Sequence, residues 1–259
     1  MDPVERFAAI VSGRGPGPTL DVGALAIAAG ADPTLEPEVW LAELDRLAEG
    51  VDSLEGLVRR LFVDEGFAGN AGDYYDPRNS LLDRVLKRKL GIPITLSVVC
   101  IEVGRRAGVS LEGVGMPGHF LVRPLGTNRY LDAFAGGELL DLTACEKRFR
   151  ASTGAGPEVS FGPHLLSTAP LRSILARILA NLRTTYRRRG EAAHLEWVLR
   201  MRLALPGVTA AELVELGHAM GQQGRCLDGA AFLEAQADEY PHWAQVLRPA
   251  ARALRAQLN

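Results

Sequence analysis

A change of hydrophobic period within residues 79–132 restricts the fold of this chain more than any other feature. The first part of this stretch has the capping residues, apolar spacing and glycine stops of two helices, and the second part alternates as short strands do. The predicted elements are helices over residues 81–90 and 95–107 and strands over residues 111–116, 120–123 and 129–133. His119 stands at the start of the second strand, and Asp132 lies on the third. Two helices followed by a small antiparallel sheet predict an α+β core.

Helical patterns surround this core on both sides. Residues 1–67 have apolar residues at helical spacing, and the chain is helical again from Pro170. In this second region similar residues recur 34 positions apart: Gly190 and Gly224, Leu182 and Leu216, Leu199 and Leu233. Helix-turn-helix units with a period of 34 residues are typical of tetratricopeptide repeats, and a plain helical bundle is the alternative.

The segment between the core and the repeats is predicted to be a linker. Residues 151–169 are rich in Gly, Ser, Thr and Pro, which favour irregular structure. The predicted domains are therefore residues 1–150, which hold the core and its N-terminal helices, and residues 170–259, which hold the repeats.

The charge balance and the cysteine spacing exclude several classes of function. The chain has 29 Lys and Arg against 31 Asp and Glu, which argues against a nucleic-acid-binding surface. Its three cysteines are widely spaced and its N-terminus lacks the apolar core of a signal peptide, so we expect a cytoplasmic protein. No apolar run is long enough to span a membrane. No spacing typical of a metal site occurs, and no cofactor is predicted.

The pair of His119 and Asp132 indicates half of a thiol-type acyl-transfer site. Such a site needs a thiol at a helix N-terminus, a His that accepts its proton and an Asp or Asn that orients the His. The expected helix start contains no Cys, and Thr95 is its only well-placed hydroxyl. Cys100 lies more than a turn further on and is predicted to be a buried structural thiol. The candidate catalytic residues are therefore His119, Asp132 and Thr95. The structural alternatives are a His119–Asp132 bridge that braces the sheet and a Thr95 that caps its helix.

Several motifs of the chain resemble the bacterial SirB family. They are Gly66-Phe67, Tyr75-Asp76-Pro77-Arg78-Asn79-Ser80, Gly91-Ile92-Pro93-Ile94-Thr95-Leu96-Ser97, Pro117-Gly118-His119-Phe120-Leu121-Val122 and Leu131-Asp132. The resemblance covers nearly the whole chain and implies a papain-like, transglutaminase-like region followed by tetratricopeptide repeats. It also implies a Cys–His–Asp triad, in which His119 and Asp132 match the pattern and the helix start from Pro93 to Thr95 lacks the Cys.

This combination predicts a non-catalytic or repurposed transglutaminase-like protein that acts as a regulatory scaffold. It would bind a peptide or protein partner through its C-terminal repeats. The alternative is a Cys-free hydrolase or acyltransferase that uses His119 and Asp132. We further predict that Thr95, His119 and Asp132 converge in one cleft, covered by the loop of residues 66–78 with its two tyrosines.

Overall fold

The computed structural model of the chain describes residues 2–13 and 19–257, and these residues form two compact units. The unit that contains the sheet, here called the sheet unit, comprises residues 19–28 and 34–178. The other, the helical unit, comprises residues 2–13, 29–33 and 179–257. The division falls inside the long helix α8 (Leu171–Arg189), whereas the predicted domains are separated at residues 151–169.

The sheet unit begins with helices and short irregular elements. They are α2 (Leu20–Ala29), α3 (Pro37–Ala48), α4 (Leu54–Val58), a π-helical turn η1 (Arg59–Asp64), strand β1 (Ala68–Gly69), a 3-10 turn η2 (Pro77–Ser80), α5 (Leu82–Arg88) and β2 (Leu90–Gly91). Helix α5 is shorter than predicted because Lys89 adopts a left-handed conformation with φ of 58°. The next two residues then pair with β1 in a parallel two-stranded ladder. Ser80, which stands just before the predicted helix, belongs to the preceding 3-10 turn.

Helix α6 (Pro93–Arg106) begins two residues earlier than predicted. Pro93 occupies its first position, where the fixed φ of proline suits a helix and its missing N–H costs no hydrogen bond. Thr95 is therefore the third residue of the helix and not its N-cap. Its Oγ1 still serves the helix start, because it accepts a hydrogen bond from the backbone N–H of Ile92 at 3.2 Å. Nearly all of α6 is buried, which places it at the centre of the unit.

An antiparallel sheet follows α6, and its strand order is β6-β5-β4-β3-β7. The strands are β3 (Leu111–Met116), β4 (His119–Pro124), β5 (Tyr130–Asp132), β6 (Glu138–Leu140) and β7 (Ser167–Thr168). Strands β3 and β4 are joined by Pro117 and Gly118, and the φ of +73° at Gly118 permits this tight connection. The predicted α+β fold with a small antiparallel sheet is confirmed. Strand β7 lies within the segment that we predicted to be a linker.

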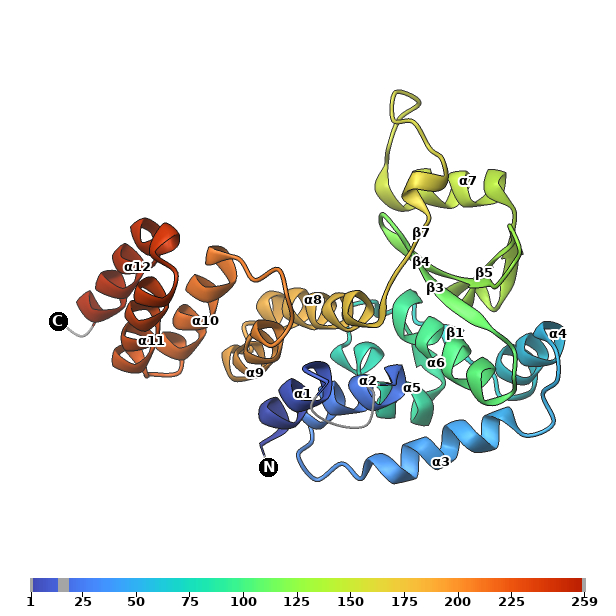
Figure 1. Cartoon of the computed structure of the whole chain (residues 1–259), viewed down its shortest axis with the longest axis horizontal. Coiled ribbons are helices and arrows are strands. Elements are labelled where there is room, and N and C mark those ends of the chain that lie inside the picture. The colour runs from blue at the N-terminus through green and yellow to red at the C-terminus, as the bar shows by residue number, and fades with distance from the viewer. Residues whose placement is uncertain (1, 14–18, 258–259) are drawn as a thin grey trace. The chain divides into compact units, whose positions relative to one another are not determined.

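The sheet is covered by helices on both faces (Figure 1). Helix α7 (Leu142–Thr153) contributes Cys145 and Phe149 to a core with Val114 and Leu121 of the sheet. On the opposite face, α6 packs against β3 and β4. Glycine at position 113 lets α8 approach this face closely, since a Cβ there would lie 3.0 Å from Ile174.

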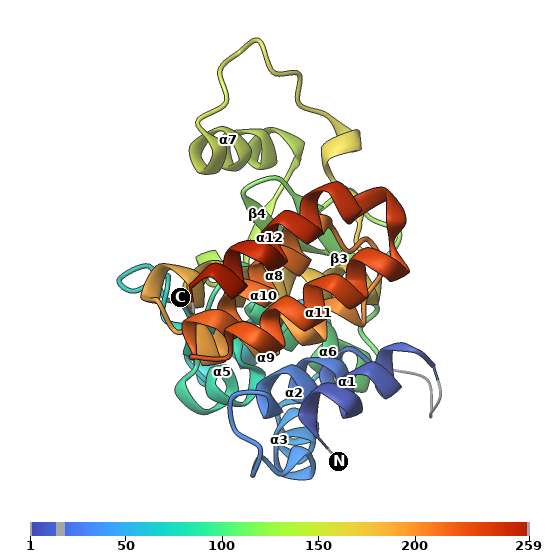
Figure 2. The same ribbon diagram turned by 90° about the vertical axis from the view of Figure 1, so that its left-hand side faces the viewer.

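The helical unit contains α1 (Pro3–Val11), the C-terminal part of α8, α9 (Ala192–Leu203), α10 (Ala210–Gln222), α11 (Cys226–Glu239), a 3-10 turn η5 (Pro241–Trp243) and α12 (Ala244–Ala256). Gly190 lies in the turn between α8 and α9, and Gly224 lies in the turn between α10 and α11. Both glycines have positive φ. Helices α10, α11 and α12 pack on one another around Leu213, Leu233 and Leu247 (Figure 2). Consecutive helix pairs are thus present, and their assignment as tetratricopeptide repeats stays a prediction. No helix in the described residues is long and apolar enough to cross a membrane.

Candidate functional site

The side chains of His119 and Asp132 meet inside the sheet unit, as predicted. His119 Nε2 lies 2.9 Å from Asp132 Oδ1. The same oxygen accepts hydrogen bonds from the backbone N–H groups of Phe134 (3.0 Å) and Ala135 (3.2 Å), so Asp132 also caps the 3-10 turn η3 (Ala133–Ala135). Its other oxygen, Oδ2, lies 3.1 Å from Arg148 Nε of α7. The carboxylate is therefore held from three sides.

The charges around Asp132 favour its ionised form. Asp132 is completely buried, and burial alone would raise its pKa. The hydrogen bond and charge of His119, the charge of Arg148 and the N–H of Ala135 outweigh burial and hold the pKa below its ordinary value. An ionised carboxylate in this position fixes the orientation of the imidazole ring, which is the function of the third member of a catalytic triad. It is equally the function of a buried structural bridge.

Ring contacts through Phe134 link His119 to the surface loop of residues 66–78. The ring of Phe134 meets the His119 ring edge-on, with centroids 6.2 Å apart, and Tyr74 meets Phe134 in the same way at 6.2 Å. His119 is 6% exposed, whereas Tyr74 is 39% exposed. Its second ring nitrogen, Nδ1, has no hydrogen-bond partner among the described residues. The loop of residues 66–78 therefore reaches the pair indirectly, through Tyr74 and Phe134.

The hydroxyl of Thr95 is committed to the backbone. Its Oγ1 donates to the carbonyl of Asn79 at 2.6 Å and accepts from Ile92 N, and the residue is 1% exposed. No hydrogen bond joins Thr95 to His119 in the part of the chain that the structure describes. Of the three candidate catalytic residues, the hydrogen bonds join His119 to Asp132 and leave Thr95 in a separate backbone network.

Asn79 organises that network and was missed by the sequence analysis. It is completely buried, and its side-chain amide donates to the carbonyls of Asp73 (2.7 Å) and Tyr74 (3.3 Å). Its side-chain oxygen accepts from Asn70 Nδ2 at 3.0 Å. Asn79 thus ties the loop above the site to the start of α6. The motif that contains it was recognised, but nothing in its spacing indicated which atoms it would bind.

Neither buried thiol of the sheet unit is placed or ionised as a nucleophile. Cys100 lies in the second turn of α6, is completely buried, and has a pKa that burial raises to about 12. Burial and the nearby carboxylates of Asp141 and Asp132 raise the pKa of Cys145 to about 11. A thiol is nucleophilic as the thiolate, so both residues are structural. The expectation of a buried Cys100 agrees with this environment.

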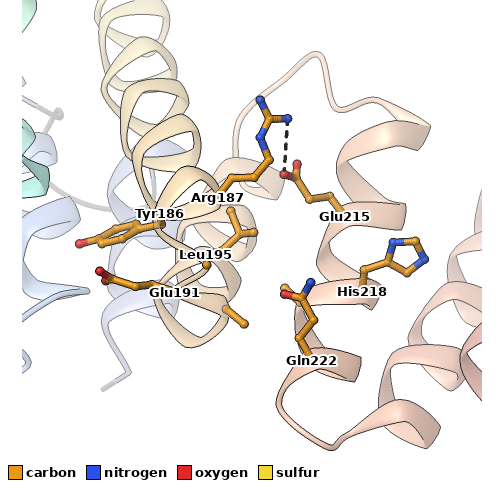
Figure 3. A pocket seen from close by; sticks show the side chains of 10 residues that line it. Tyr186, Arg187, Glu191, Leu195, Glu215, His218 and Gln222 are labelled. Carbon is orange, nitrogen blue, oxygen red and sulfur yellow. Dashed lines mark ion pairs between the residues drawn. The ribbon is translucent and has the colours of Figure 1, made fainter. Parts of the chain in front are cut away.

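A second candidate site is a cavity in the helical unit (Figure 3). It has a volume of about 190 Å³ and is lined by Tyr186, Arg187, Gly190, Glu191, Ala192, Leu195, Glu215, His218, Ala219 and Gln222. Figure 3 shows Arg187 and Glu215 at one end, Gln222 at the other and Leu195 between them. Glu215 Oε1 is buried, accepts no hydrogen bond from the residues that the structure describes and lies 4.0 Å from Arg187 Nη1, while its other oxygen accepts from Arg183 Nε. An apolar floor with polar ends suits a side chain of a partner.

Residues 27–180 match the family model of the transglutaminase-like superfamily, and because this match covers more than half of the chain, the chain belongs to that superfamily. The transglutaminase-like part of the predicted resemblance is thus confirmed, and the relationship to SirB stays a prediction. No solved structure matches the chain.

Relatives occur in bacteria and in mammals. A UPF0162 protein of Xylella fastidiosa (strain Temecula1) is 47% identical over 152 residues, which cover 58% of this chain and 54% of the relative. A UPF0162 protein of Pseudomonas aeruginosa is 33% identical over 185 residues, 67% of each protein. Human F-box only protein 21 is 31% identical over 134 residues, 48% of this chain and 20% of the relative. The chain spans about half the length of the Xylella relatives that it matches.

Proposed function

We propose that this chain is a non-catalytic transglutaminase-like protein that serves as a scaffold for a peptide or protein partner. The observation that carries the proposal is the start of α6. The first turn of this helix has no thiol, and its buried hydroxyl, that of Thr95, is occupied by Asn79 and Ile92. A base and its orienting carboxylate without a nucleophile do not make an acyl-transfer site. In this reading His119 and Asp132 brace the sheet against α7.

The partner surface that we propose is the C-terminal helical array, in the manner of tetratricopeptide repeats. Two observations support it. Helix pairs recur with turn glycines 34 residues apart at Gly190 and Gly224, and the cavity of Figure 3 lies between successive pairs. The buried Glu215 Oε1 has no hydrogen bond, and such an atom is stabilised when a bound partner supplies a donor. A partner side chain with an apolar stem and an N–H donor fits these groups.

The test of the non-catalytic proposal is an activity screen on the purified full chain. The wild type and His119→Ala would be incubated with peptide amides, esters and glutamine-containing peptides, and the release of product would be followed by mass spectrometry. We expect no turnover above the buffer control for either protein. Turnover that disappears in a folded His119→Ala variant would contradict the proposal.

The partner surface is tested by affinity capture followed by binding of the purified partner. The test variant is Gln222→Arg, which fills the cavity from an exposed position. The matched control is Arg252→Glu, also exposed but on α12 and outside the lining. We expect the cavity variant to weaken binding by about tenfold or more, as for a central contact, and the control to leave it unchanged. Equal affinity of the partner for both variants would show that the cavity is not part of the partner-binding surface.

A second candidate function is a Cys-free hydrolase or acyltransferase. One observation favours it: Asp132 orients His119 through Nε2, which leaves Nδ1 without a hydrogen bond and available as a base. The nucleophile would be a water molecule or Thr95. The screen described above separates the two functions, and Thr95→Val assigns any observed activity to one of these nucleophiles.

A further inference from the structure

Arg177 is a half-buried cation that has no anionic partner among the residues that the structure describes. It lies on α8 in the sheet unit, and its Nη2 donates to the backbone carbonyls of His119 (2.6 Å) and Met116 (3.2 Å). Its guanidinium covers the ring of Phe120 at 5.4 Å from the centroid. Within residues 2–13 and 19–257 no carboxylate lies within ion-pair distance of it. Burial accordingly lowers the pKa of Arg177, with the phenol of Tyr74 acting in the opposite direction.

This environment differs from that of other arginines in the unit. Arg148, Arg106 and Arg123 are each paired with one or more carboxylates. Arg172, on the same helix as Arg177, is exposed and needs no partner because water solvates it. A guanidinium that is partly removed from water costs free energy unless an anion compensates it. The two carbonyls compensate only one of its three nitrogens.

The remaining donors of Arg177 are free to bind a ligand. Nε and Nη1 have no acceptor in the described part of the chain, and neither is among its fully buried unpartnered atoms. Both nitrogens therefore reach solvent. The sheet fixes the position of the guanidinium, because Nη2 is hydrogen-bonded to the carbonyls of Met116 and His119 at the β3–β4 turn.

We infer that Arg177 binds a carboxylate group of a ligand. A planar guanidinium matches a carboxylate with two parallel hydrogen bonds. One guanidinium balances a single negative charge, whereas a phosphate dianion would need a second cation. Arg148 cannot provide it, because Asp132 and Glu138 already hold it. The carboxylate comes from the C-terminus of a peptide or from an acidic side chain, and the two sources are separable by experiment.

The site is independent of the partner surface proposed above. Arg177 lies in the sheet unit, whereas the cavity lies in the helical unit. Failure of either proposal therefore leaves the other standing, and the carboxylate site is not expected to depend on Gln222.

The experiment is an NMR titration of the full chain labelled with ¹⁵N-arginine. The Nε–H signal of Arg177 is identified by its loss in Arg177→Lys, and that of Arg172 by its loss in Arg172→Lys. The probes are N-acetyl-Ala-Ala with a free carboxylate, its C-terminal amide, N-acetyl-Glu-amide and inorganic phosphate, all at constant chloride. We expect a saturable shift of the Arg177 signal with N-acetyl-Ala-Ala if the ligand is a peptide C-terminus, or with N-acetyl-Glu-amide if it is an acidic side chain. We expect no shift with the C-terminal amide and no saturable shift at Arg172.

A variant then tests the donors. We expect Arg177→Gln to weaken binding by about tenfold or more, because it removes hydrogen bonds to a charged group. The melting temperature confirms that the variant is folded, and the wild-type titration stands without it. A shift that is absent with both carboxylate probes, or equal at Arg172, overturns the site. A response to phosphate as strong as the carboxylate response overturns the assignment of the ligand class.

Discussion

The sheet end and the helix end of the transglutaminase-like region differ in which parts of a catalytic triad they contain. At the sheet end, His119 and Asp132 retain the contact of a base with its orienting carboxylate, supported by Arg148 and two backbone N–H groups. At the helix end, the first turn of α6 holds no thiol, and Thr95 is bonded to Asn79 and Ile92. A His–Asp contact therefore does not identify an enzyme by itself. The same geometry stabilises a sheet when the nucleophile is absent.

The largest effect in this comparison is expected from Asp132→Ala. Removing a completely buried carboxylate leaves His119 and two backbone N–H groups without this partner, and Arg148 keeps only Glu138 among the described residues. Breaking such a buried pair costs about 3 kcal/mol of unfolding free energy. Urea denaturation measures it, with Asp132→Asn as the control, since the amide keeps an acceptor and should cost less. A midpoint that Asp132→Ala leaves unchanged would show that the sheet end is not a structural bridge.

A smaller loss is expected at the helix end from Thr95→Val. The valine has nearly the same shape but lacks the hydroxyl that joins Asn79 O to Ile92 N. We expect a loss of about 1–2 kcal/mol, because two buried backbone groups lose a partner. Thermal unfolding measures the change, and Thr95→Ser, which keeps the hydroxyl, should lie close to the wild type. Equal stability of all three proteins would refute the structural role of this hydroxyl.

Because of Asp132 at the sheet end, we also expect the stability of the protein to depend on pH. The pKa of Asp132 is held below its ordinary value, so the folded state binds its proton less tightly than the unfolded state. The resulting stabilisation is complete above the ordinary pKa of 3.8 and is lost as the pH falls through the lower folded value. Unfolding free energies measured in urea between neutral pH and about pH 3 should therefore fall more steeply for the wild type than for Asp132→Asn.

The contribution of Asp132 is read from the difference between the wild-type and Asp132→Asn curves, because other carboxylates also contribute to the pH dependence of stability. Glu102 has the opposite shift: burial, opposed by Arg105, raises its pKa, so its own contribution to stability grows as the pH falls. Parallel curves for the wild type and Asp132→Asn would contradict the assignment to Asp132.

The smallest expected effect concerns the thiol of α6. Cys100 is completely buried with a pKa near 12, so iodoacetamide should not modify it in the folded protein at neutral pH. Peptide mass spectrometry after alkylation, with a urea-unfolded sample as the positive control, measures this directly. Rapid modification of Cys100 in the folded state would show that α6 carries a reactive thiol and would contradict the structural role assigned to Cys100.

The sequence predicted the sheet end of the site better than the helix end. The hairpins and the contact of His119 with Asp132 follow from alternation and turn residues, which are local signals. The predicted helix start at Thr95 lies two residues too late, because threonine is a common N-cap residue, whereas Pro93 occupies the first helical position. Asn79, Arg148 and Arg177 act through long-range contacts that have no local pattern. Strand β7 was missed for the same reason, since it is two residues long and pairs with β3, more than 50 residues earlier.

The sequence by itself determined the α+β class, the helical C-terminal region and the absence of a cysteine at the start of α6. These properties follow from periodicity and residue identity, which need no knowledge of partners. The tertiary structure alone decided that the Thr95 hydroxyl is occupied, that Asp132 is held by α7 through Arg148, and that no carboxylate of the described residues pairs with Arg177. Hydrogen-bond satisfaction and charge compensation depend on which distant groups meet, and only folding brings those groups together.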